Sequence, residues 1–175
     1  MMWVLFFVLW LILCSAAIAG ISAAPWVPTR KRELAHLTKI PFQKNGTVID
    51  LGCGSGTVLF ALAQLRPDLR LIGYEISLLP LFLAYARKYT HRARYKQVSI
   101  RFGNLFHQDL SQADGLIIFL LERTYQKLLS RLVDRLKDDC LLVVEAWEFP
   151  GLTPEETLEQ EQALPLYLYR GNQLR

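Results

Sequence analysis

The first 28 residues contain no aspartate, glutamate, lysine or arginine, although charged residues make up 21% of the chain. At about 1.5 Å per residue, a helix from Trp3 to about Ala24 measures roughly 33 Å, enough to cross a hydrocarbon core of about 30 Å. We therefore interpret residues 1–28 as a transmembrane anchor. A cleaved signal peptide is the alternative, because small residues such as Ala19 and Ala23 are compatible with a cleavage site.

Basic residues are absent before this apolar run and present directly after it, at Arg30, Lys31 and Arg32. They belong to residues 29–46, which we interpret as a basic juxtamembrane linker with a short helix. The positive-inside rule places this side of the anchor in the cytoplasm, and basic side chains here can meet anionic head groups. We expect a single-pass membrane protein whose partner is the lipid bilayer and whose cytoplasmic domain occupies residues 47–175.

Metal-binding and disulfide patterns are also lacking. The three cysteines have no Cys-x-x-Cys spacing, and the three histidines lack the spacing of metal ligands. We expect no disulfide framework and no metal site. The net charge of +4 is modest for 175 residues, so charge alone does not indicate nucleic acid as a partner.

From Thr47 onward, short β-type runs alternate with helix-like runs, a pattern typical of βαβ units in a parallel sheet. Strands are expected at residues 47–51, 69–76, 97–103, 115–121, 140–149 and 166–170. Helices are expected at residues 57–65, from Ser77 onward as a helix cap, and at residues 124–136. This order predicts an α/β fold with a doubly wound, mostly parallel sheet.

The stretch "VIDLGCGSG" ends the first expected strand with three alternating glycines, Gly52, Gly54 and Gly56. Glycines at the carboxyl end of a strand permit positive φ and let a ligand lie against the backbone. The run matches neither the G-x-G-x-x-G of dinucleotide sites nor the G-K-[ST] of a P-loop. Asp50 just before the glycines would repel a pyrophosphate, and it suits a ligand with a positive amino group.

Two further polar residues follow the next strands. Glu75 ends the second expected strand, where a carboxylate can accept hydrogen bonds from both hydroxyls of a ribose. Asn104 follows the third strand and can present its amide to an adenine edge. An amino group, a ribose and an adenine would then be recognised in order along three strand ends.

"DLGCGSG" together with "GYEIS" resembles the class I S-adenosylmethionine-dependent methyltransferases, whose first motif is acid-x-G-x-G-x-G and whose second acid follows the next strand. The resemblance implies a Rossmann-like sheet and S-adenosylmethionine as the cofactor. It also implies that the cofactor is held by Asp50, Gly52, Gly54, Gly56, Glu75, Ile76 and Asn104.

The order of an apolar segment, "PWVPT", a short helix-like stretch and the glycine motif is similar to the membrane-anchored protein-lysine methyltransferases. That family includes mitochondrial enzymes acting on the ATP synthase c-subunit and the adenine nucleotide translocase. The resemblance implies N-methylation of a lysine in a membrane-associated protein. "LLER" does not match the N-P-P-[YFW] of amide and nucleobase methyltransferases, so a nucleic acid substrate is not expected.

Two alternatives for function stay open. The chain could methylate a lipid-soluble small molecule, or it could be a non-catalytic S-adenosylmethionine-binding module of the membrane. The resemblance supplies no residue as a catalytic base. Glu122 is the acid nearest to the expected acceptor entrance, but it can equally begin the next helix and stabilise its dipole.

The C-terminal end is the other open point. The fold normally ends with a helix and a β-hairpin, and only 26 residues follow Phe149. That length predicts a hairpin that is truncated.

Overall fold

The computed structural model of the chain describes residues 2–22, 29, 33–159 and 161–175. The helices are α1 (Met2–Ser22), α2 (Thr57–Leu65), α3 (Leu78–Thr90) and α4 (Tyr125–Leu132), with short 3₁₀ helices η1 (Glu33–Thr38), η2 (Leu105–His107), η3 (Glu122–Thr124) and η4 (Gly171–Leu174). The strands are β1 (Thr47–Leu51), β2 (Arg70–Glu75), β3 (Val98–Phe102), β4 (Gly115–Ile118), β5 (Leu141–Glu145), β6 (Glu156–Leu158) and β7 (Leu166–Arg170).

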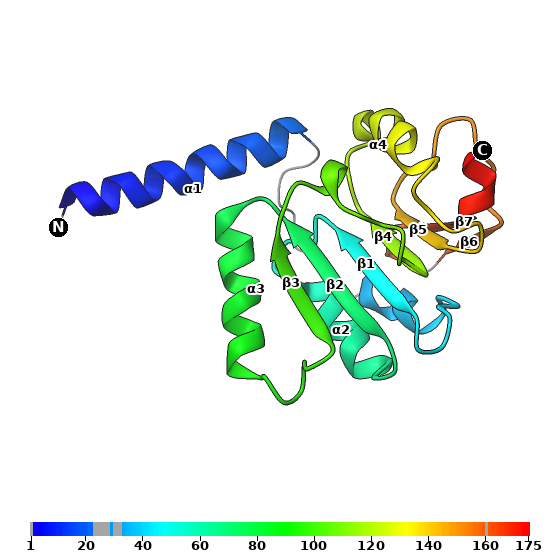
Figure 1. Cartoon of the computed structure of the whole chain (residues 1–175), viewed down its shortest axis with the longest axis horizontal. Coiled ribbons are helices and arrows are strands. Elements are labelled where there is room, and N and C mark those ends of the chain that lie inside the picture. Colours follow the sequence, from blue (N-terminus) through cyan, green and yellow to red (C-terminus); the bar gives the residue numbers. More distant parts are fainter. Residues whose placement is uncertain (1, 23–28, 30–32, 160) are drawn as a thin grey trace.

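The strands form one seven-stranded sheet in the order β3-β2-β1-β4-β5-β7-β6 (Figure 1). The first five strands pair in parallel, and β7 pairs antiparallel with both β5 and β6. The strand order reverses between β1 and β4, so helices cover both faces. The expected doubly wound, mostly parallel sheet is confirmed.

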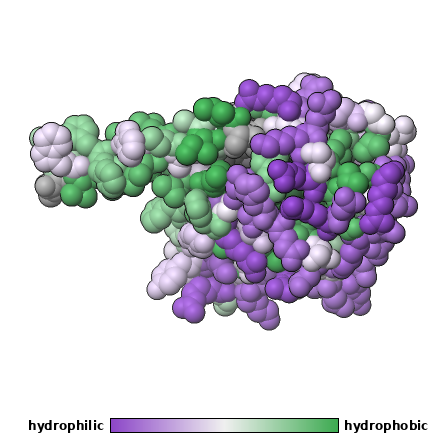
Figure 2. Space-filling model, turned by 45° about the horizontal axis from the view of Figure 1, so that its top comes forward, coloured by the Kyte–Doolittle hydropathy of each residue, from purple (hydrophilic) through white to green (hydrophobic). Residues whose placement is uncertain are grey.

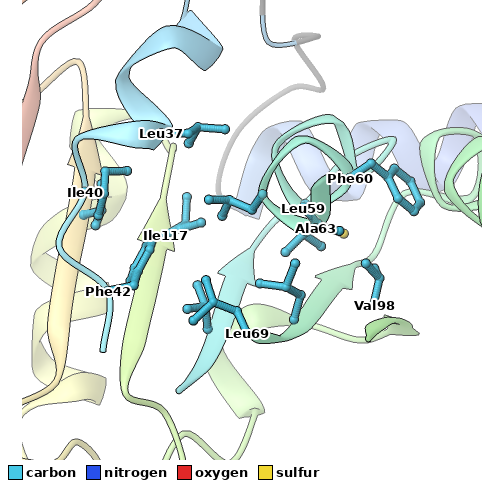
Figure 3. Close-up of a cluster of buried hydrophobic side chains, with 14 of the residues drawn as sticks. Leu37, Ile40, Phe42, Leu59, Phe60, Ala63, Leu69, Val98 and Ile117 are labelled. Atoms are coloured by element: carbon cyan, nitrogen blue, oxygen red, sulfur yellow. The ribbon is translucent and has the colours of Figure 1, made fainter. Parts of the chain in front are cut away.

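Each face of the sheet carries its own apolar core. On one face, α2, α3 and η1 cover a cluster that includes Leu59, Phe60 and Val98 (Figure 3). Leu37 and Phe42, which precede β1, are buried in the same cluster. The opposite face is covered by α4, η2 and η4.

Two central strands end earlier than their apolar runs. The run of residues 115–121 leaves the sheet after Ile118, and the run of residues 140–149 leaves it after Glu145. Phe119, Leu120 and Leu121 beyond β4 and Ala146 and Trp147 beyond β5 line a cavity, so their hydrophobicity serves the cavity wall. Helix α4 likewise ends at Leu132 and not at Leu136, and η3 precedes it.

The expected truncation of the C-terminal hairpin is wrong. Strands β6 and β7 pair antiparallel and complete the sheet. The hairpin fits because the connection from β5 to β6 contains no helix. In that connection, the Phe149 N–H donates to Tyr169 Oη at 3.0 Å, and the Phe149 ring packs between Tyr125 and Tyr169.

Helix α1 projects from the domain (Figure 1). Residues Met2–Ile21 are long and apolar enough to cross a membrane by length and composition, a property that signal sequences share. Two hydrogen bonds join the base of α1 to the domain among the contacts of the described residues: Ser15 Oγ accepts the Leu78 N–H at 3.1 Å, and Arg123 Nη2 donates to the Gly20 carbonyl at 2.7 Å. The basic residues 30–32 lie outside the described residues.

The Phe149–Tyr169 hydrogen bond predicts the effect of Tyr169→Phe. The substitution keeps the ring and removes the acceptor of a buried N–H, so the free energy of unfolding should fall by about 1–3 kcal/mol. Urea unfolding measures the change. Tyr167→Phe on the same strand is the matched control, and equal losses in both variants would contradict the assignment.

Candidate active site

A cavity of about 310 Å³ opens at the carboxyl ends of the parallel strands. Residues after β1, β2, β3, β4 and β5 all line it, together with Ala19 of α1 and Thr29. It lies across the point where the strand order reverses, between β1 and β4. In open α/β sheets this is where ligands bind.

The glycine loop after β1 has the backbone that its sequence predicts. Gly52, Gly54 and Gly56 have φ angles of +90°, +54° and +75°. The N–H groups of Gly52 and Cys53 both donate to the Tyr74 carbonyl, at 2.9 and 3.0 Å, which holds the loop against β2. Gly52 and Gly54 line the cavity.

Gly56, unlike Gly52 and Gly54, is not among the described residues that line the cavity. It is the N-cap residue of α2. A Cβ at this position would lie 2.7 Å from the Phe60 ring, and the positive φ also disfavours a side chain. Gly56 therefore shapes the turn from the loop into the helix.

Glu75 fastens the loop to the strand beside it. Its Oε2 accepts the Gly54 N–H at 2.8 Å, and its Oε1 accepts the N–H groups of Ile76 at 2.8 Å and Ser77 at 2.6 Å. The carboxylate is buried, and Ile76 and Ser77 also line the cavity. Ser77 begins α3 without a side-chain cap, so one carboxylate joins the glycine loop, the end of β2 and the start of α3.

Asp50 lies on the cavity wall at the end of β1. Burial, together with the charge of Glu75, raises the pKa of Asp50 to about 7. Burial and the same two carboxylates raise the pKa of the neighbouring Cys53 thiol well above its ordinary value. The thiol therefore stays neutral, and a cation in the cavity would favour the ionised form of Asp50.

Asn104 lies in the cavity wall after β3. Its Oδ1 accepts the Phe106 N–H at 3.0 Å and caps η2. The amide oxygen keeps a second lone pair, so both Oδ1 and the amide nitrogen can act on a ligand.

The sequence analysis missed an acid in this cavity, Glu145, which ends β5 and is buried. Its neighbour Ala146 has a φ of +77°, an uncommon conformation for a residue with a side chain, and Trp147 follows in the cavity wall. The available signal was the one used for Asp50 and Glu75, an acid at the end of a parallel strand. Glu122 is instead exposed at the start of η3 and is not among the described residues that line the cavity.

Of the described side chains that line the cavity, those that carry charge are all carboxylates. Asp50, Glu75 and Glu145 line it, and among the described lining residues there is no lysine, arginine or histidine. In a site with low exposure to water, such a set attracts cations and repels phosphate groups.

A model of the family described as ANTKMT methyltransferase domain matches residues 50–156, from Asp50 through to the start of β6. The chain belongs to this methyltransferase family. Among its relatives, the ATP synthase c-subunit lysine N-methyltransferase of Homo sapiens is 24% identical over 86% of this chain and 65% of its own length. A protein-lysine N-methyltransferase of Saccharolobus islandicus is 28% identical over 83% of this chain and 92% of its own. The chain thus spans slightly less than two thirds of the human relative.

The fold has solved counterparts. An RNA methyltransferase from Salinibacter ruber, in complex with S-adenosyl-L-homocysteine, superposes with a TM-score of 0.74 over 82% of this chain and 93% of its own, at 24% identity. The family's methyl donor is S-adenosylmethionine. The residues fit such a donor, because the acidic wall suits its sulfonium and amino group, and the glycine loop lets a ligand approach the backbone.

The three hydrogen bonds of Glu75 predict the effect of Glu75→Gln. An amide cannot accept at both ends, so at least one of the three N–H groups loses its partner. The free energy of unfolding should fall by about 1–3 kcal/mol, and S-adenosylhomocysteine should bind more weakly. Denaturant unfolding and calorimetric titration measure the two effects. Glu122→Gln makes the same change at an exposed site and should alter neither.

Proposed function

We propose that the chain is a membrane-anchored, S-adenosylmethionine-dependent protein-lysine N-methyltransferase with its domain on the cytoplasmic side. The observation that carries the proposal is the acidic cavity with α1 at its edge, because lysine is a cationic acceptor and Ala19 of α1 lines the wall. The relatives named as lysine methyltransferases support the same acceptor.

We assign the cofactor to the β1–β3 side of the cavity. Asp50 would hold its amino group, Glu75 its ribose and the Asn104 amide its adenine, along the backbone of Gly52, Gly54 and Ile76. A carboxylate has about four lone-pair sites, and Glu75 already uses three of them for N–H groups. One site is thus free, so two ribose hydroxyls would have to compete with one of the three N–H groups for the carboxylate.

The acceptor belongs on the β4–β5 side, which Phe119, Leu120, Glu145 and Trp147 line. S-adenosylmethionine supplies a methyl group already activated on a positive sulfur. The protein has to align a neutral lysine amine, whose ordinary pKa is about 10.4, and exclude water. Glu145 can orient the amine by accepting its hydrogen bond and can take up a proton, while the aromatic walls exclude water.

The proposal is tested with the full chain in native membranes and tritiated methyl donor. Tritium in the protein fraction, recovered after acid hydrolysis as methyl-lysine, supports it. Tritium in the lipid extract would favour a lipid-soluble small molecule as the acceptor. Cofactor binding with no transfer to either fraction would indicate a non-catalytic module.

The pKa of Asp50 predicts how cofactor affinity depends on pH. A cationic ligand binds the ionised form, so affinity is retained above the pKa of about 7 and lost below it. The dissociation constant should be about eightfold weaker at pH 6 than at pH 7.5, by one-proton linkage. Calorimetric titration measures this. Asp50→Asn should bind more weakly and lose the pH dependence, and an unchanged slope would refute the role of Asp50.

The position of Glu145 predicts a kinetic effect of Glu145→Gln. Loss of the proton acceptor should lower kcat by about 10²-fold, while the affinity for the cofactor stays close to that of the wild type. Methyl transfer at saturating cofactor measures kcat. The control is Glu148→Gln, an exposed glutamate in the same loop that is not among the described lining residues. Equal kcat in wild type and Glu145→Gln would exclude the assignment.

A further inference from the structure

Helix α3 has an apolar face that the domain does not cover. Its inner residues Pro80, Leu81 and Ala84 are buried. The opposite side, which we name the α3 outer face, consists of the exposed residues Leu79, Phe82, Leu83, Tyr85 and Tyr89. Phe82 is 67% exposed and Tyr89 72%. Scattered exposed apolar residues are normal, but a contiguous patch on one helix marks an interaction site.

The α3 outer face is continuous with α1. The Ser15–Leu78 hydrogen bond joins the base of α1 to the first residue of α3. Figure 1 shows α1 projecting from the domain and α3 running across the direction of that projection. In Figure 2 the hydrophobic surface passes from α1 onto the adjoining side of the domain. If α1 crosses a bilayer, α3 runs along its surface.

The contact with Ser15 sets the level of α3 along α1. Residues 2–14 of α1 lie on the N-terminal side of this contact, and at about 1.5 Å each they extend roughly 20 Å away from α3. The start of α3 therefore lies toward the domain end of the apolar helix. Interfacial amphipathic helices bury their apolar face about 5–10 Å into the head-group boundary, which is the level expected for a helix at the end of an anchor.

The charges of α3 agree with a lipid surface. The helix contains no acidic residue, and its C-terminal end carries Lys88 with Arg92 just beyond, 5.9 Å from the Tyr89 ring. Arg87 instead folds back over the Phe60 ring at 4.7 Å. Tyrosines and basic side chains at the end of an apolar face are typical of the membrane interface.

We propose that the α3 outer face lies in the head-group region of the bilayer that α1 crosses, so that lipid covers it. The inference rests on the membrane anchoring in the proposed function. It adds a second point of membrane contact, which fixes the orientation of the domain and brings the acidic cavity to the membrane surface.

The test uses the full chain in vesicles of phosphatidylcholine with a minority of phosphatidylglycerol. Nitroxide labels are attached at Phe82→Cys, Tyr85→Cys, Leu9→Cys and Ser130→Cys, each in a Cys14→Ser background. The two remaining cysteines, Cys53 and Cys140, are buried. Collision with oxygen, which partitions into lipid, is compared with collision with an aqueous nickel chelate. Ser130 is the control, because it is exposed on α4 across the sheet.

The expected result is several-fold greater accessibility to oxygen than to nickel at positions 9, 82 and 85, and the reverse at position 130. Lipid exposure at position 9 with water exposure at positions 82 and 85 would overturn the inference, leave the anchor intact and favour an acidic protein on this face. Water exposure at position 9 would overturn the anchor as well.

Discussion

The cavity depends on the carboxylate of Glu75 and the three backbone N–H groups that it accepts. A buried carboxylate is costly unless hydrogen bonds replace its water, and here they come from the glycine loop, the end of β2 and the start of α3. The same charge acts on Asp50, whose pKa rises to about 7 through burial and this repulsion. Glu75 therefore organises the loop, and Asp50 responds to what enters the cavity.

The buried acids that favour a cationic ligand also lower the stability of the folded chain when they are ionised. An acid whose pKa is raised by folding binds a proton more tightly in the folded chain than in the unfolded one. For Asp50 this contribution to stability is lost as the pH rises from about 4 through about 7. Above that pH the empty cavity holds repelling acids, and a cationic ligand relieves the repulsion. The acidic wall is thus unfavourable for the empty protein and favourable for the complex.

The sequence was informative wherever one local feature determines the structure. Alternating glycines after a buried strand predicted the positive φ angles, and acids at strand ends predicted neighbours in space because parallel strands end at one edge of the sheet. The sequence did not predict the end of a strand where both the buried strand and the cavity wall that follows it need apolar residues. "GLIIFLL" is apolar both as β4 and as cavity wall, so composition does not mark its end at Ile118.

Non-local contacts were also beyond prediction. Strand β6 has only three residues, with no apolar alternation, and exists because β7 pairs with it. Ser77 looks like a helix cap in sequence, yet the Leu78 N–H is accepted by Ser15, 63 residues away. Glu145 follows the same pattern as Asp50 and Glu75, an acid at a strand end, but "VVEAWEF" contains two acids, and it is the fold that places Glu145 and not Glu148 among the described residues of the cavity wall.

In the proposed arrangement, the acidic cavity distinguishes a cationic lysine from the anionic lipid head groups around it. Anionic head groups favour the basic end of α3 and are repelled by a cavity that Asp50, Glu75 and Glu145 line. A lysine near the bilayer extends its ammonium toward the interface, and the cavity attracts it. The Ser77 N–H that donates to Glu75 lies at the start of α3, so in this arrangement the helix that meets the membrane is joined to the side of the cavity to which we assign the cofactor. The start of α3 thus links the proposed position of the domain on the membrane to the acidic cavity, which favours a cationic group.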